Sequence, residues 1–144
     1  MLIGQYTSVL TAKRRVAVPK KFRQELGKKM IVARWYEGCL VIISEENWQA
    51  LLTKLTGKAE VIVASVRDTD RFILGSAYET EPDGQGRVVL PELLVTYARL
   101  GEEVVFIGLG DRVEIWDREA WSQRETYVSQ KAADLIEEYA STKK

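Results

Sequence analysis

The chain carries two copies of one unit, and this internal repeat constrains the fold more than any other feature of its 144 residues. The segment Arg-Val-Ala-Val-Pro at positions 15–19 recurs as Arg-Val-Val-Leu-Pro at positions 87–91. Further matches follow in the same order: Leu26-Gly27 with Leu100-Gly101, residues 38–44 with residues 111–117, and Trp48 with Trp121. A unit of about 45 residues buries little surface alone, so we expect the two copies to pack together.

Both copies are predicted to share one order of elements: two strands, a short helix, a β-hairpin and a second helix. In the first copy the residue pattern predicts strands at 7–12, 15–18, 29–36 and 39–43, with helices at 20–26 and after Ser44. In the second it predicts strands at 76–81, 87–90, 104–109 and 112–116, with helices at 92–100 and after Asp117. We therefore expect a mainly β protein with short helices, which is an α+β fold.

The strand and helix at residues 15–26 illustrate the prediction. Polar and apolar residues alternate at 15–18, which directs Val16 and Val18 to the core. Pro19 ends this strand and suits the start of a helix, in which Phe22 and Leu26 lie four residues apart on one face. The strand and the helix are therefore expected to contact the same core.

The segment between the copies, residues 57–75, admits two interpretations. Val61-Ile62-Val63 favours a strand by propensity, whereas the spacing of Val63, Val66 and Ile73 favours a helix. We divide the chain into a first half at 1–56, a connecting segment at 57–75 that we treat as helical, a second half at 76–122, and a C-terminal helix and tail at 123–144. The helix that begins after Asp117 is expected to carry Trp121, Val128, Ala132, Leu135 and Tyr139 on one face.

The net charge of zero conceals two oppositely charged halves. Residues 1–72 hold 13 Lys and Arg against 7 Asp and Glu, a net charge of +6, and residues 73–144 have a net charge of −6. Nine of the basic residues lie between Lys13 and Arg34, where Glu25 is the only acid. This asymmetry indicates a polyanionic partner or head-to-tail self-association, and the alternative is a solvated basic face.

Composition excludes several classes of enzyme. The chain has no histidine and one cysteine, Cys39, so it cannot form a Ser-His-Asp triad, a Cys-His pair, a His-ligated metal site, an intrachain disulfide or a cysteine zinc site. The loop at 83–86 lacks the Lys-Ser/Thr of a P-loop and the acidic ladder of an EF-hand. We expect no enzyme activity and no cofactor.

We also expect a cytoplasmic location and no membrane partner, because no apolar run approaches about 20 residues and residues 1–11 lack a signal-peptide pattern.

Several short motifs occur in a fixed order. They are Met-Leu-Ile-Gly-Gln-Tyr at 1–6, Ala-Lys-Arg-Arg at 12–15, Val18-Pro19, Phe22-Arg23, Gly38-Cys39-Leu40, Asp-Gly-Gln-Gly-Arg-Val at 83–88, Leu90-Pro91 and Glu-Ile-Trp-Asp at 114–117. In order and spacing they resemble the MraZ family, whose two halves are similar to the swapped-hairpin DNA-binding domain of AbrB-type regulators. The resemblance implies two such halves in an interleaved swapped-hairpin β-barrel.

The resemblance also implies a function. It points to a sequence-specific transcriptional regulator that binds double-stranded DNA at repeated promoter sites, near the start of the division and cell-wall gene cluster. It further implies a homo-oligomer, as a ring of subunits, located at the nucleoid. Two other interpretations stay open: an assembly protein whose basic half docks on an acidic partner, and an AbrB-like antitoxin.

The family box has the form Asp-x-x-x-Arg in each half. In the second half it maps onto Asp83 and Arg87, but in the first it maps onto Thr11 and Arg15, so the acid is missing. Arg14 also replaces the glycine of that turn. The predicted DNA-binding residues are Lys13, Arg14, Arg15, Lys20, Lys21, Arg23, Asp83 and Arg87.

These residues are assigned different roles. Arg15 and Arg87 are predicted to read base edges or fix the turns, because a guanidinium can bond guanine bidentately. The other five cations are predicted to contact phosphates, and Asp83 to order its turn. For Arg87 the alternative is an ion pair with Asp83 that only holds the turn.

Overall fold

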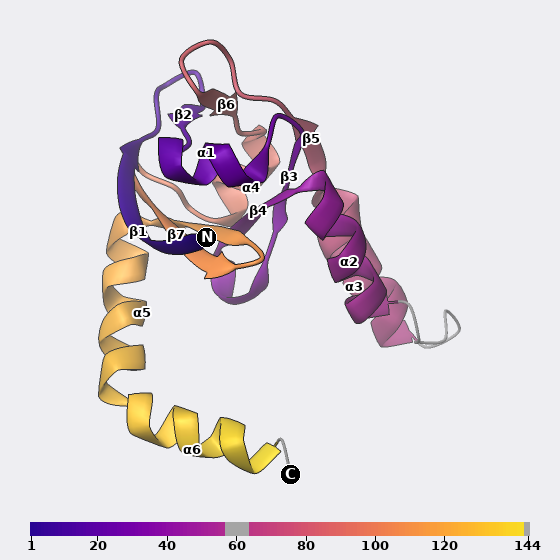
Figure 1. The fold of residues 1–144 in the computed structure, drawn as a ribbon, viewed down its shortest axis with the longest axis vertical. Helices are drawn as coiled ribbons and strands as arrows, with labels where there is room; N and C mark the ends of the chain where they lie inside the picture. Colours follow the sequence, from indigo (N-terminus) through magenta and orange to yellow (C-terminus); the bar gives the residue numbers. More distant parts are fainter. Residues whose placement is uncertain (57–63, 143–144) are drawn as a thin grey trace.

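The computed structural model describes residues 1–56 and 64–142, and its elements follow the order expected from the repeat (Figure 1). The strands are β1 Leu2–Val9, β2 Arg15–Ala17, β3 Met30–Arg34, β4 Leu40–Ser44, β5 Tyr78–Thr80, β6 Arg87–Val89, β7 Glu103–Gly110 and β8 Val113–Asp117. The helices are α1 Lys20–Leu26, α2 Glu45–Thr56, α3 Ala64–Ile73, α4 Glu92–Tyr97, α5 Arg118–Gln130 and α6 Ala132–Thr142, with short 3-10 helices at Tyr36–Gly38 and Leu74–Ser76. The strand interpretation of residues 61–63 falls outside the described residues.

Strands from the two halves pair with each other. A six-stranded antiparallel sheet has the order β1-β7-β8-β4-β3-β5, and β2 and β6 form a separate two-stranded sheet. β1 of the first half pairs with β7 of the second, where Ser8 lies opposite Val104. β5 of the second half pairs with β3 of the first in the matching register, where Thr80 lies opposite Met30. The two copies are thus joined by reciprocal strand exchange, in agreement with the expectation that they pack together.

The inner strands of the six-stranded sheet are buried on both faces. Along β4, Leu40 and Ile42 belong to one apolar cluster, and Val41 and Ile43 belong to another. The first cluster includes buried residues of β2, β6, α1 and α4: Val16, Phe22, Leu26, Val88 and Leu94. The second includes Trp48 and Leu51 of α2 and Ile73 of α3, and Trp121 of α5 packs against it. The first cluster therefore supports the two-stranded sheet and fixes its position.

Several predicted bounds differ from the structure by one to three residues, as for the helix predicted at 92–100, which is Glu92–Tyr97, and two predictions differ more. The strand predicted at 7–12 is β1, which begins at Leu2 and ends at Val9, and all eight of its residues pair with β7. The start of β1 was missed because most of its side chains are exposed, so apolar and polar residues do not alternate along it. The C-terminal helix is broken at Lys131, whose φ of −104° and ψ of 6° separate α5 from α6. Neither helix buries a residue, so no packing enforces one straight helix. Figure 1 shows α6 running at an angle to α5.

The structure is a mixed α/β fold with an antiparallel sheet and several helices. Within the described ranges, β1 and β5 lie at opposite edges of the six-stranded sheet and do not pair. The expected closed swapped-hairpin barrel is therefore not confirmed. Among the same residues, no helix is both long enough and apolar enough to cross a bilayer.

Candidate nucleic-acid interface

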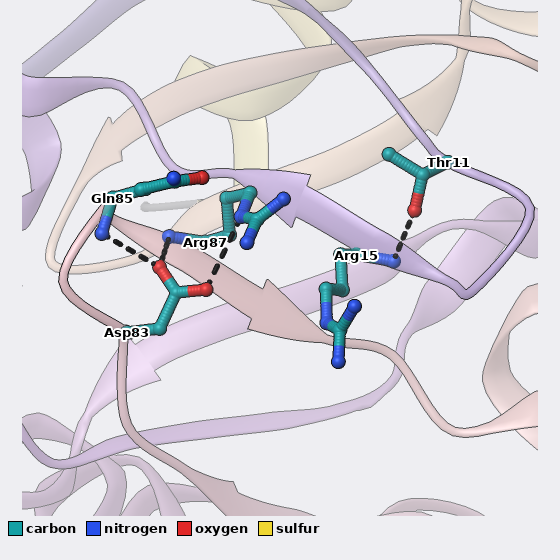
Figure 2. Close-up of polar contacts among 5 residues, drawn as sticks. All are labelled: Thr11, Arg15, Asp83, Gln85 and Arg87. Carbon is teal, nitrogen blue, oxygen red and sulfur yellow. Dashed lines mark hydrogen bonds and ion pairs between the residues drawn. The ribbon is translucent and has the colours of Figure 1, made fainter.

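The two family boxes lie at opposite ends of the two-stranded sheet (Figure 2). We call residues 11–15 the first turn and residues 83–87 the second turn. Val16 and Val88 lie opposite each other and are buried, so the neighbouring residues of both strands face outward. Arg15 and Arg87 therefore share the outer face of the sheet. They are diagonal neighbours, because Arg15 lies opposite Val89, two residues along β6 from Arg87. Diagonal neighbours on antiparallel strands are typically about 7–8 Å apart.

The two turns share one backbone structure. In the first turn the Thr11 N–H donates to the Arg15 carbonyl, and the Arg14 N–H donates to the Thr11 carbonyl, both at 2.9 Å. The equivalent bonds of the second turn measure 2.8 and 2.9 Å. Both turns need a positive φ at the fourth residue, which is 61° at Arg14 and 76° at Gly86. The first turn thus holds an arginine in the left-handed region that favours glycine.

The Asp83 carboxylate organises the second turn. Its Oδ1 accepts the backbone N–H groups of Gln85 and Arg87, each at 2.9 Å, and its Oδ2 accepts Arg87 Nε at 3.1 Å (Figure 2). The bond from the Arg87 N–H lowers the pKa of Asp83 most, and the Gln85 N–H and the Arg87 charge lower it further. The ion pair that was the alternative interpretation of Arg87 is therefore present, and it fixes the direction of the Arg87 side chain.

Thr11 replaces only part of this arrangement in the first turn. Its Oγ1 accepts the backbone N–H of Arg15 at 3.1 Å (Figure 2). In the described part of the chain, no acid pairs with the Arg15 guanidinium. The sheet therefore presents one arginine oriented by a carboxylate and one whose guanidinium is not held by an acid.

Arg14 and Arg23 lie differently from the other predicted cations. Arg14 Nε donates to the Leu90 carbonyl at 3.0 Å, at the end of β6. Arg23 extends from α1 over the second turn, because a Cβ placed on Gly86 would collide with its guanidinium. The sequence assigned Arg23 to the first half, but the structure brings it to the turn of the second half.

Lysines complete the surface. Lys13, Lys20 and Lys21 are exposed, and none of them forms an ion pair within the described ranges. A cleft of about 630 Å³ lies beside Arg23, between α1 and the second turn, and is lined by Arg23, Gly27, Lys28 and residues 81–86. Sequence reasoning missed Lys28 as a neighbour of the second turn, since no local pattern reports contacts between the copies.

The described residues contain no group of three or more His, Cys, Asp or Glu side chains that could hold a metal ion. The recurring tryptophans belong to the second apolar cluster instead of the outer surface. Trp48 is buried, and Trp121 packs against Trp116 with ring centroids 5.4 Å apart. Trp35 is also buried and belongs to the same cluster.

Comparison with known proteins identifies the family of this repeat. The family model described as "MraZ protein, putative antitoxin-like" matches residues 1–72 and again residues 73–143. The chain is 40% identical over 141 residues to the Transcriptional regulator MraZ of Caldicellulosiruptor saccharolyticus, which covers 96% of this chain and 98% of the relative. It is 40% identical to the protein of the same name from Thermoanaerobacter sp., with 85% of each chain covered, and 36% identical to that of Bifidobacterium longum, with 91% and 85% covered. The chain therefore belongs to the MraZ family.

Proposed function

We propose that this chain is a sequence-specific, DNA-binding transcriptional regulator. The observation that carries the proposal is the outer face of the two-stranded sheet, on which Arg15 and Arg87 lie diagonally with a turn at each end. A two-stranded ribbon fits the major groove, where guanidinium groups can reach base edges. The names of the relatives, which are transcriptional regulators, support the same role.

The two arginines are proposed to contribute differently. Asp83 holds Arg87 in one direction, which suits bidentate recognition of a guanine. No acid holds Arg15 in the described structure, so its full positive charge is available to a base or to a phosphate. The exposed lysines at positions 13, 20 and 21, which form no ion pair among the described residues, add sequence-independent phosphate contacts.

DNA titration at two salt concentrations tests the proposal. Wild type, Arg15→Ala and Arg87→Ala would be compared on the duplex from upstream of the gene and on a mixed-sequence duplex of equal length. Loss of a bidentate base contact in Arg87→Ala is expected to cost about 1–3 kcal/mol on the specific duplex alone, whereas loss of a phosphate contact in Arg15→Ala would weaken binding to both duplexes. Lys54→Ala, which removes an exposed cation from α2, is the matched control. Absence of binding at low salt, or binding that does not depend on salt, would contradict the function.

The target and the assembly extend this proposal. We infer that the regulator acts at the nucleoid on repeated sites near the start of the division and cell-wall gene cluster, as a ring of subunits. Repeated sites favour an oligomer, because linked binding units gain effective concentration. Exposed Ile136 and Tyr139 on α6 offer apolar area for subunit contact.

Two measurements test the target and the assembly. Footprinting of that promoter should show evenly spaced protection, and sedimentation should give a closed oligomer. A monomer at micromolar concentration would contradict the ring.

A second candidate function is assembly through opposite charges. The net charges of +6 and −6 on the two halves allow a basic half to dock on an acidic half of a neighbour, which closes rings or extends filaments. Such an oligomer should dissociate as salt is raised, whereas one held by α6 should not. Binding of an acidic protein without any binding of DNA would favour this function over the first.

A further inference from the structure

We propose that one guanidinium lies at each turn and binds a backbone phosphate of DNA. At the first turn it comes from Arg14, within the turn itself, and at the second turn it comes from Arg23, on α1. The two-stranded sheet would then contact DNA phosphates at both of its ends, where the two turns lie. The inference rests on the proposed DNA-binding function. It assigns phosphate contacts to the second turn, although that turn belongs to the half with a net charge of −6.

The position of Arg23 supplies the first step. A Cβ on Gly86 would collide with Nη1 and Cζ of Arg23 and would lie 2.9 Å from its Nε. The guanidinium therefore lies directly on the glycine of the second turn. It is half-buried, and no acid or hydrogen-bond acceptor in the described residues holds it. A cation placed beside a turn without a partner is available to a phosphate.

Arg14 supplies the second step, because it occupies the position equivalent to Gly86. The Gly86 carbonyl accepts the Val18 N–H at 3.0 Å, and the Arg14 carbonyl accepts the Leu90 N–H at 2.8 Å. These bonds join each turn to the end of the opposite strand. Arg14 Nε also donates to the Leu90 carbonyl, so its guanidinium lies at this same junction. Each junction thus has one guanidinium.

The residue on the neighbouring helix differs in a matching way. Counting from Pro19 and Pro91, the residue of α4 equivalent to Arg23 is Val95. Val95 packs against the apolar core. The second turn combines a glycine with an arginine on the helix, and the first combines an arginine with a valine on the helix. This exchange indicates one guanidinium site for each turn, filled from the turn or from the helix.

Substitution at both sites tests the inference on the full chain. Arg14→Gly removes the first guanidinium and suits the positive φ, and Arg23→Val reproduces the residue found at position 95. Each is expected to weaken binding to the mixed-sequence duplex about 5-fold near 0.15 M salt and to reduce the salt slope by about 0.9. Arg14→Gly combined with Val95→Arg is expected to restore both quantities. Lys54→Ala is the control for loss of one remote charge.

The outcomes separate this inference from the proposed function. Normal DNA binding by Arg23→Val, together with weakened binding by Arg14→Gly, would overturn the symmetric arrangement and leave the function standing. Failure of the wild type to bind either duplex would overturn the function itself. Circular dichroism checks that each variant folds, and Arg23→Gln replaces Arg23→Val if the valine variant does not. An unchanged salt slope in Arg23→Gln would contradict the inference equally.

Discussion

Arg87 donates its Nε to the Asp83 carboxylate at 3.1 Å, and the same carboxylate accepts the Arg87 backbone N–H at 2.9 Å. One residue thus orders both the turn and the side chain that projects from it. In the first half, Thr11 occupies the equivalent position and bonds only the backbone N–H of Arg15. The two boxes keep one backbone structure but differ in how firmly they orient their arginine.

Stability should depend on the ionisation of Asp83. Its pKa is lowered in the folded state, mainly by the Arg87 N–H, so its contribution is present above about pH 4 and is lost as pH falls through the folded pKa. We expect Asp83→Asn to lower the urea midpoint at pH 6, and the difference from wild type to narrow toward pH 3. Urea unfolding at fixed protein concentration measures this. Asp68→Asn, on an exposed pair with Arg71, is the control. Equal midpoints at pH 6 would contradict the role of Asp83.

The first turn should accept the missing acid. Thr11→Asp is expected to pair with Arg15 as Asp83 pairs with Arg87, because the two turns share their backbone hydrogen bonds. The new carboxylate would reduce phosphate contact and lower the salt slope on mixed-sequence DNA by up to about 0.9. Thr11→Asn, which keeps the turn but adds no charge, is the matched control. The same slope for the Asp and Asn variants would show that Arg15 does not contact phosphate.

The repeat made part of this site predictable. Alignment of the two copies makes Val16 equivalent to Val88 and Arg15 equivalent to Arg87, and in the structure both valines are buried in one core. The pairing of their strands with each other is seen only in the structure. Local patterns could not show that Arg23 covers Gly86, since that contact joins residues from different copies.

Regions without packing were also beyond prediction. The edge strand β1 carries mostly exposed residues and lacks alternation, so its start was missed. The break at Lys131 occurs in a segment that buries no side chain and holds no glycine or proline. Patterns of apolar residues report what packs, and neither feature is fixed by packing.

Arg14 should affect stability in two opposing ways. Its φ of 61° is a conformation that costs a non-glycine residue about 1–2 kcal/mol. Its Nε bond to the Leu90 carbonyl offsets about 1 kcal/mol of this cost. Arg14→Ala loses the bond and keeps the unfavourable φ, so we expect it to be about 1 kcal/mol less stable than wild type. Arg14→Gly should lie within about 1 kcal/mol of wild type and above Arg14→Ala, as measured by urea unfolding. The reverse order would show that the turn is not strained.

Cys39 should be unreactive in the folded protein. It is fully buried, and burial raises the pKa of its thiol, with the charges of Glu114 and Glu37 acting in the same direction. The folded state therefore keeps the proton while the unfolded state releases it above about pH 8.5, so this thiol makes stability fall as pH rises above that value. We expect labelling by a thiol reagent only after unfolding, and a smaller loss of stability between pH 8 and about 9.5 in Cys39→Ala. Rapid labelling of the native protein would contradict the buried position.

Gly108 should be essential to the exchange of strands between the halves. It lies opposite Gly4 in the β1–β7 pair, and a Cβ at Gly108 would lie 2.6 Å from Leu2 C and from Ile3 N. These are backbone atoms of β1, so the strand must move away and lose pairing with β7. We expect Gly108→Ala to destabilise the fold by about 1–3 kcal/mol in urea unfolding and to speed hydrogen exchange at the β1 amides. Gly75→Ala is the control, because a Cβ there would meet no heavy atom within 4 Å. Unchanged exchange at β1 in Gly108→Ala would mean that β1 does not lie as closely on β7 as the structure places it.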